Sequence, residues 1–296
     1  MTYEPNLGLL FDVDGPLASP VSRTIAIPSI LTDLVRLASA GVPIAFITGR
    51  SQAFIRDEVV APLLQNGLAE AFSTGNVRMF GVFEKGAAWS TIGPQGLGDV
   101  TVDESVALPA ATVDAVRELV ASTFSNTMFF DETKVAMISV EQRMDVAHAD
   151  YVAEQGPFND AVFQLVADHG LGIRFGDRVA AAADGSVPFR IDPTIISTDV
   201  ESILLDKDRG AERALEYFAG LGALPTRWRS VGDSRGDYLM ADHLHAAGYD
   251  VAHVDVRPSD GVLTRDYPIV IEGDLIHDFA GAAFLAHWVK ELDLVS

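Results

Sequence analysis

The sequence predicts an α/β protein in which a parallel sheet covered by helices is interrupted by a smaller α+β domain. In the first third of the chain, short apolar runs alternate with helical patterns, which is typical of parallel sheets. The middle third has amphipathic helices with adjoining short strands, and the last third returns to the first pattern. We therefore assign residues 1–88 and 200–296 to a discontinuous α/β domain, and residues 89–199 to an inserted α+β domain.

The first third reads as β-α-β-α-β. Its opening strand is a short apolar run that ends at Asp12, Asp14 and Gly15, and such a run indicates a fully buried strand. Gly41 ends the first helix, and Pro62 lies near the end of the second. Helices are expected over 30–38 and 52–64, and further strands over 43–47, 71–73 and 79–83.

The inserted domain and the last third contribute the other elements, after a turn-rich break over 93–98. The inserted domain is expected to have helices over 112–124 and 158–169, and strands over 135–140, 172–175, 179–183 and 187–191. The last third is expected to have helices over 211–221, 238–247 and 280–292, and strands over 228–231, 251–254 and 269–271.

The composition disfavours several classes of function. The chain of 296 residues has a net charge of −21, which argues against nucleic acid and anionic membrane surfaces as partners. It has no cysteine, so it has no disulfide, thiolate metal site or thiol nucleophile, as fits a cytoplasmic protein. No apolar run approaches the length of a membrane span, and the N-terminus lacks the basic region of a signal peptide. The oligomeric state stays open.

Polar side chains follow strand ends or open helices at four places in the predicted α/β domain. Because the carboxyl ends of parallel strands share one edge of a sheet, these groups are expected to converge. The first group alone is also ordinary turn sequence, so only the ordered set points to chemistry. The four groups are Asp12 with Asp14, Thr48 with Gly49, Lys207, and Asp233 with Asp237.

This ordered set resembles the haloacid dehalogenase (HAD)-like hydrolase superfamily over the whole chain. The family's four motifs match Asp12-Val13-Asp14-Gly15, Thr48 at a strand end, Lys207 at a helix start, and Gly232-Asp233 with Asp237 four residues later. The resemblance implies a Rossmann-like core. The inserted domain lies between the second and third motifs, which resembles the IIB subclass with a large α/β cap. That subclass includes sugar-phosphate phosphatases, and the layout is similar to sucrose-phosphate, trehalose-phosphate and mannosyl-3-phosphoglycerate phosphatases.

The resemblance also implies roles for the acidic residues. Asp12 would attack phosphorus and form an aspartyl-phosphate. Asp14 would protonate the leaving oxygen and then activate water. Mg²⁺ would be held by Asp12, the Asp14 backbone carbonyl and Asp233. Asp237 would be a further ligand or would hold the other ligands in place.

Other residues near the motifs are candidates for binding phosphate or substrate. Thr48 and Lys207 would hold the phosphoryl oxygens, although Thr48 could equally cap the following helix. Arg50 is either a substrate contact or an ion-pair partner inside the core domain. Lys85, which stands where the subclass often has Asn, is either a substrate contact or a surface charge. The full set of candidates is Gly15, Thr48, Gly49, Arg50, Lys85 and Lys207.

Two further features bear on substrate binding. Pro16 departs from the family, which commonly has Thr there, and proline removes one backbone N–H from the loop. In the inserted domain, Lys134 and Arg143 flank a predicted strand and are candidates for reading the leaving group.

The sequence therefore predicts a Mg²⁺-dependent phosphatase of a small phosphorylated metabolite such as a sugar phosphate. Asp14 favours phosphate esters, because a dehalogenase needs no acid two residues after its nucleophile. Two alternatives stay open: a phosphomutase-like phosphotransferase, and a catalytically silent binding module on the same scaffold.

Overall fold

The chain divides into two compact units in a computed structural model that describes residues 6–294. Unit 1 comprises Met1–Thr101 and Asp206–Ser296, and unit 2 comprises Val102–Leu205. These boundaries lie beyond the 88/89 and 199/200 positions expected from the sequence. Strands β4 (Ala88–Gly93) and β5 (Gly96–Leu97) form a hairpin that extends the sheet of unit 1, so the expected break over 93–98 is a hairpin turn. Strand β12 (Ser197–Ser202) pairs within unit 2.

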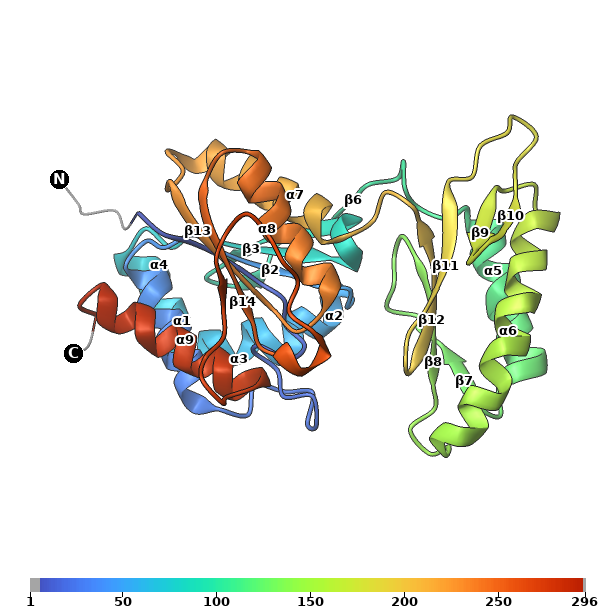
Figure 1. Cartoon of the computed structure of the whole chain (residues 1–296), viewed down its shortest axis with the longest axis horizontal. Helices are drawn as coiled ribbons and strands as arrows, with labels where there is room; N and C mark the ends of the chain where they lie inside the picture. The colour runs from blue at the N-terminus through green and yellow to red at the C-terminus, as the bar shows by residue number, and fades with distance from the viewer. Residues whose placement is uncertain (1–5, 295–296) are drawn as a thin grey trace. The chain divides into compact units, whose positions relative to one another are not determined.

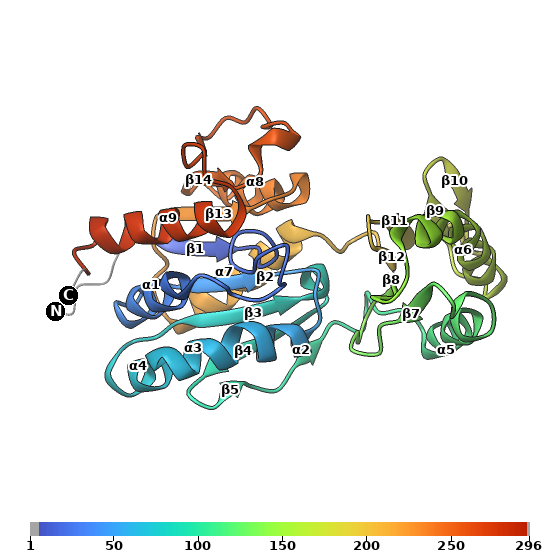
Figure 2. The ribbon, with the colours of Figure 1, turned by 90° about the horizontal axis from the view of Figure 1, so that it is seen from below.

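Unit 1 is built on a sheet whose central strands are parallel (Figures 1 and 2). Besides β4 and β5, its strands are β1 (Gly8–Phe11), β2 (Ile44–Ile47), β3 (Met79–Phe83), β13 (Arg227–Gly232), β14 (Asp250–Asp255) and β15 (Ile269–Val270). Strand β6 (Thr101–Val102) contains the boundary between the two units. Within residues 6–294 the order is β15-β14-β13-β1-β2-β3-β4-β5, and β6 pairs with β4. The six strands from β15 to β3 are parallel, and β1 to β3 are buried along their whole length. The predicted α/β fold is confirmed.

Helices cover both faces of this sheet (Figure 1). On one face α1 (Pro28–Ser39) packs against α9 (His277–Glu291), and on the other α7 (Lys207–Leu221) packs against α8 (Tyr238–Ala246). The apolar stripe of α1, which includes Ile30, Leu34 and Leu37, is fully buried. Amphipathic helices are therefore held in place by burying this stripe against the sheet.

The helical segment after β2 is longer than predicted. It comprises α2 (Gln52–Ile55), α3 (Ala61–Leu63) and α4 (Ala69–Thr74), joined by π-helical turns over 56–60 and 64–68. The strand expected over 71–73 is therefore wrong. Gly67 has a φ of +104°, which lets the chain bend and then resume the helix. Leu68 and Ala71, one helical turn apart, are both buried.

Unit 2 is an α+β unit with helices on one face of a sheet (Figure 1). Besides β12, the sheet contains β7 (Met128–Phe130), β8 (Ile138–Gln142), β9 (Ile173–Phe175), β10 (Arg178–Ala180) and β11 (Phe189–Pro193). Its helices are α5 (Ala110–Leu119), continued by a π-helical turn over 120–124, and α6 (His148–Asp168). Among the described strands the order is β10-β9-β11-β12-β8-β7, and only the β11–β9 pair is parallel.

Helix α6 begins ten residues before the predicted start, because it continues across Gly156 and Pro157. Proline inside a helix removes one backbone hydrogen bond. Tyr151 and Phe158 lie seven residues apart on the same side of the helix, and both are fully buried. Burial of these rings therefore holds the helix together where local sequence predicts a break.

None of the helices in the part of the chain that the structure describes is both long enough and apolar enough to cross a bilayer.

Candidate active site

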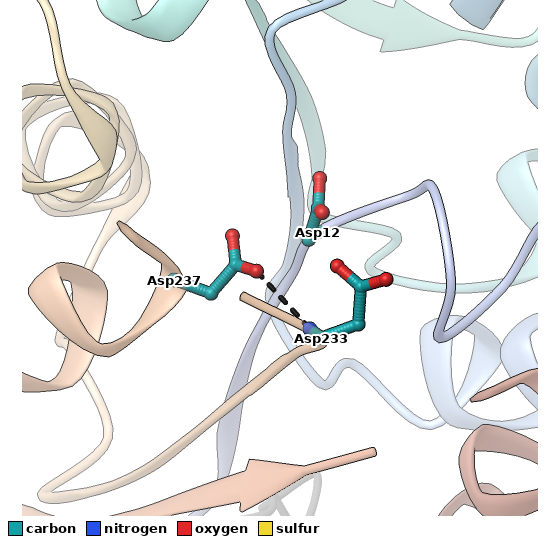
Figure 3. A group of neighbouring side chains, drawn as sticks. All are labelled: Asp12, Asp233 and Asp237. Carbon is teal, nitrogen blue, oxygen red and sulfur yellow. Dashed lines mark hydrogen bonds between the residues drawn. The ribbon is translucent and has the colours of Figure 1, made fainter. Parts of the chain in front are cut away.

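Two parallel strands bring the first and last acidic motifs together. Strand β1 pairs with β13, with Phe11 opposite Val231, and the Asp12 N–H donates to the Val231 carbonyl at 2.9 Å. Asp12 and Asp233 therefore follow adjacent strand ends. One carboxylate oxygen from each of Asp12, Asp233 and Asp237 lies within 4.8 Å of the other two (Figure 3). We call these three residues the carboxylate group.

Lys207 lies against this group. It is the first residue of α7, whose N-terminus is capped by the Asp206 side chain. Its Nζ lies 2.6 Å from Asp12 Oδ1, 2.9 Å from Asp237 Oδ1 and 2.7 Å from the Ile47 carbonyl oxygen. Gly210 allows this approach, because a Cβ there would lie 2.3 Å from Ile47 Cγ2. Lys207 thus joins the ends of β1, β2 and β13.

Asp237 holds the loop that carries Asp233. Its Oδ2 accepts hydrogen bonds from the Asp233 N–H at 3.1 Å, the Ser234 N–H at 2.9 Å and Ser234 Oγ at 2.8 Å. Gly232 is required beside it, since a Cβ at that position would lie 2.1 Å from Asp237 Cβ. Oδ2 of Asp237 thus positions the loop, whereas Oδ1 faces Lys207 Nζ at 2.9 Å.

The electrostatics of the group follow from its burial. Burial raises the pKa of Asp12 well above its ordinary value, and Asp237 adds to this against the opposing charge of Lys207. Burial and Asp237 raise the pKa of Asp233 to about 6. Burial works against ionisation of Asp237 too, but Lys207 and the Ser234 hydrogen bonds outweigh it and lower its pKa. Burial alone would lower the pKa of Lys207, but Asp12 and Asp237 raise it above its ordinary value.

The donor set fits a hard divalent cation. One lysine faces three buried or half-buried carboxylates, which leaves an excess of negative charge. Within residues 6–294 no hydrogen bond reaches the Asp233 carboxylate, and none reaches Oδ2 of Asp12. Oxygen donors of this kind, with room for water, are the ligands that Mg²⁺ prefers. Asp12 and Asp233 could therefore hold Mg²⁺ through their free oxygens.

Asp14 and Arg50 form a bidentate ion pair. Arg50 Nε donates to Asp14 Oδ2 at 3.0 Å, and Nη2 donates to Oδ1 at 3.2 Å. The side chain of Asp14 thus lies outside the carboxylate group and is held by a guanidinium. Of the two interpretations of Arg50, the structure shows the ion pair within unit 1.

The remaining predicted residues form the loops around the group. Gly15 has a φ of +95°, and a Cβ there would lie 2.7 Å from Asp233 Cγ, so only glycine fits. Thr48 is buried, and its Oγ1 accepts the Arg50 N–H at 3.0 Å rather than capping α2. The Lys85 N–H donates to the Thr48 carbonyl at 3.0 Å. A Cβ built on Gly49 would lie 3.7 Å from Lys85 Cε, so the Lys85 side chain passes beside this loop.

Helix α9 supplies contacts that the sequence did not reveal. His277, its first residue, has a φ of +51°, and its Nδ1 lies 4.0 Å from Asp233 Oδ2. Gly281 lies against the Pro16 carbonyl, which a Cβ there would approach to 1.8 Å. Pro16 is thus packed on α9. Neither contact has a sequence signal, because both join segments more than 40 residues apart.

In unit 2, Arg143 pairs with Asp145 at 2.9 Å and donates to the Ser125 carbonyl at 3.1 Å. The Lys134 N–H lies 3.5 Å from the Asp131 carbonyl, in a turn before β8. Both residues therefore belong to the local structure around β7 and β8.

No protein-family model matches the sequence, and a search of curated proteins finds no match. Solved structures do match the fold. The C-terminal domain of trehalose-6-phosphate phosphatase from C. albicans aligns at 14% identity over 96% of this chain and 92% of that chain, with a TM-score of 0.61. A haloacid dehalogenase-like hydrolase from Bacteroides thetaiotaomicron aligns at 12% identity over 95% and 98%, with a TM-score of 0.59. At these identities the similarity establishes a shared fold.

Proposed function

We propose that this chain, which has the fold of the haloacid dehalogenase-like hydrolases, is a Mg²⁺-dependent phosphatase that acts on a small phosphorylated metabolite. One observation carries the proposal: Asp12 is buried at a strand end beside the Asp233 carboxylate, with Oδ1 held by Lys207 and Oδ2 free of hydrogen bonds from any residue between 6 and 294. A fold alone does not determine function, so the proposal depends on this geometry.

In the first step, Oδ2 of Asp12 attacks phosphorus in line with the leaving oxygen. The new bond joins Asp12 to phosphorus, the bond from phosphorus to the leaving oxygen breaks, and that oxygen takes a proton from the Asp14 carboxyl. Lys207 holds Oδ1 of Asp12 at 2.6 Å, which aims the free oxygen and offsets charge on the phosphoryl group.

In the second step, water attacks phosphorus and gives its proton to the Asp14 carboxylate, and the bond from phosphorus to Asp12 breaks. Inorganic phosphate leaves, and both acids return to their starting states. Asp14 can perform these transfers only if Arg50 releases it, because the guanidinium donates hydrogen bonds to both oxygens of the Asp14 carboxylate. We therefore propose that Arg50 breaks its ion pair with Asp14 when substrate binds and forms one with the substrate phosphate.

When bound, Mg²⁺ would neutralise charge on the phosphoryl oxygens. Asp12 and Asp233 are the residues that would hold it, together with the Asp14 backbone carbonyl. Asp237 orients the Asp233 loop through its three hydrogen bonds. The Thr48 hydroxyl, which accepts from Arg50 and keeps its own proton to donate, would contact a phosphoryl oxygen.

The proposal extends to the substrate class and to the inserted unit. Unit 2 would act as a cap that selects the leaving group. A sugar phosphate is the proposed substrate, which is supported by the similar layout of a protein named as a trehalose-6-phosphate phosphatase. We include a cytoplasmic location in the proposal, since a chain without cysteine suits a reducing compartment.

A panel of phosphate monoesters tests the proposal. The full chain is assayed for release of inorganic phosphate from sugar, nucleoside and aryl phosphates, with Mg²⁺ and with a chelator. We expect phosphate release that requires Mg²⁺ and no acceptor. Release only when an acceptor alcohol is present would instead indicate a phosphotransferase. No release across the panel would contradict the proposal and favour a silent binding module.

A further inference from the structure

A cavity lies in unit 1, away from the carboxylate group. It has a volume of about 560 Å³ and opens between α9 and strands β13 to β15. Arg227, the first residue of β13, lines it, whereas Asp233 follows the other end of that strand, about 20 Å away at the usual rise of about 3.3 Å per residue. Its lining residues are Arg227, Arg229, Ala252, Val254, Pro268, Val270, Glu272, Phe284, His287, Trp288 and Glu291.

Positive charge is concentrated on one wall. Arg227 and Arg229 are two residues apart on β13, so they point to the same face of the sheet. Their guanidinium carbons lie 4.7 and 5.8 Å from the centre of the Trp288 ring. Arg229 pairs with Asp250 at 3.3 Å, whereas Arg227 forms no ion pair with any residue between 6 and 294. Burial lowers the pKa of Arg229, and the adjacent charge of Arg227 lowers it further against the opposing effect of Asp250.

Two buried N–H donors on this wall lack an acceptor. Arg227 Nε and Trp288 Nε1 are both inaccessible and make no hydrogen bond in the described chain. Unpaired buried donors are rare in folded proteins, and each one favours an acceptor atom in the space beside it. Because both residues line the same cavity, an anionic oxygen bound there would pair with the guanidinium of Arg227, which has no ion pair in the described chain.

The other lining residues indicate the size, polarity and charge of the ligand. Ala252, Val254, Val270 and Phe284 supply an apolar wall, and the volume lies in the range of small-molecule sites. Glu272 and Glu291 also line the cavity, and their charges disfavour a dianion such as inorganic phosphate.

We infer that this cavity binds a small organic monoanion, in which a carboxylate meets Arg227 and Trp288 and an apolar body lies against β14, β15 and Phe284. The site uses none of the residues of the carboxylate group, so it stands whether or not the chain is a phosphatase. A test that measures binding alone therefore keeps the two claims separate.

Calorimetric titration of the full chain with octanoate tests this inference, in the presence of a chelator so that no metal ion recruits the carboxylate. 1-Octanol is the matched ligand without charge. Inorganic phosphate is the competing dianion, and the titrations are done at about pH 8.5 so that almost all of the phosphate carries two charges. We expect one octanoate site, at least tenfold weaker binding of octanol, and no competition by phosphate.

Variants locate the site. Arg227→Gln should weaken octanoate binding at least tenfold. Arg213→Gln is the matched control, because Arg213 also stacks on a tryptophan, 4.3 Å from the Trp89 ring, but does not line the cavity. Val270→Trp, on an edge strand, should fill the cavity without removing the charge of Arg227. This variant tests the site even if Arg227→Gln does not fold.

Three results would overturn the inference: no octanoate binding, equal affinity for octanol, or binding that Arg227→Gln and Val270→Trp leave unchanged. Competition by phosphate would also contradict it, because the proposed site accepts a monoanion and not a dianion.

Discussion

Replacing Lys207 by methionine removes the cation that joins Asp12, Asp237 and the end of β2. The methionine side chain has similar volume, so the main change is the loss of the charge and of its contacts at 2.6, 2.7 and 2.9 Å. Asp12 and Asp237 are both buried, at 7% and 0% exposure, so water does not replace the interactions that their carboxylates lose. Removing one partner from a buried ion pair costs about 3–5 kcal/mol.

Urea unfolding followed by tryptophan fluorescence measures this loss. The three tryptophans, Trp89, Trp228 and Trp288, all belong to unit 1, so the signal reports on the unit that holds Lys207. With a slope of about 2 kcal/mol per molar urea, we expect the midpoint to fall by about 2 M without metal. Mg²⁺ should restore part of this loss, because it supplies positive charge to the same carboxylates.

The control is Lys290→Met, since Lys290 is exposed near the end of α9. We expect it to change the free energy of unfolding by less than about 0.5 kcal/mol. A loss of under about 1 kcal/mol for Lys207→Met, or a Mg²⁺ effect no larger than in the control, would refute the proposed charge balance.

Three further perturbations follow from the structure. Burial lowers the pKa of His253 to about 4, so between pH 6.5 and 4 the unfolded state gains a proton that the folded state does not. The free energy of unfolding, measured by denaturant titration at each pH, should therefore fall by about 3 kcal/mol over this range. If the stability of a His253→Asn variant depended on pH in the same way, the prediction would be wrong. Gly281→Ala should push on the Pro16 carbonyl, costing about 1–3 kcal/mol in thermal unfolding, whereas Gly220→Ala, whose Cβ meets nothing within 4 Å, should not destabilise. Asp14→Asn should slow the release of alcohols from alkyl phosphates about 10²–10⁴-fold and the release of phenols from aryl phosphates less, because a phenolate leaves without a proton. Equal losses in single-turnover assays of alcohol and phenol release, which report the first step alone, would exclude Asp14 as the acid.

The core of unit 1 was predictable because buried parallel strands are continuous apolar runs. Strand β3 agrees with its prediction residue for residue. Strand β12 was missed because its sequence is polar, Ser-Thr-Asp-Val-Glu-Ser. Tertiary contacts make these polar residues compatible with burial: Asp199 accepts from Ser139 Oγ at 2.7 Å, and Glu201 pairs with Arg190 at 2.7 Å. Periodicity alone does not reveal such pairs.

The candidate site also has a part that the sequence predicts and a part that it does not. The positions of Asp12 and Asp233 at strand ends, and of Lys207 at a helix start, predicted that the three residues meet at one edge of the sheet, because the topology of a parallel sheet fixes where strand ends meet. The partner of each side chain depends on distances that no spacing encodes. The ion pair of Asp14 with Arg50 and the approach of His277 to Asp233 are contacts of this second kind.

Turnover of an aryl phosphate by Asp12→Asn tests the central claim most directly. The substitution keeps the shape of the side chain but removes the attacking oxygen, and Asp266→Asn, at an exposed aspartate of unit 1, is the control. In the presence of Mg²⁺ we predict that the original chain and the control release phosphate at equal rates, and that Asp12→Asn falls to the uncatalysed background. Undiminished turnover by Asp12→Asn would contradict the assignment of Asp12 as the nucleophile and with it the proposed function.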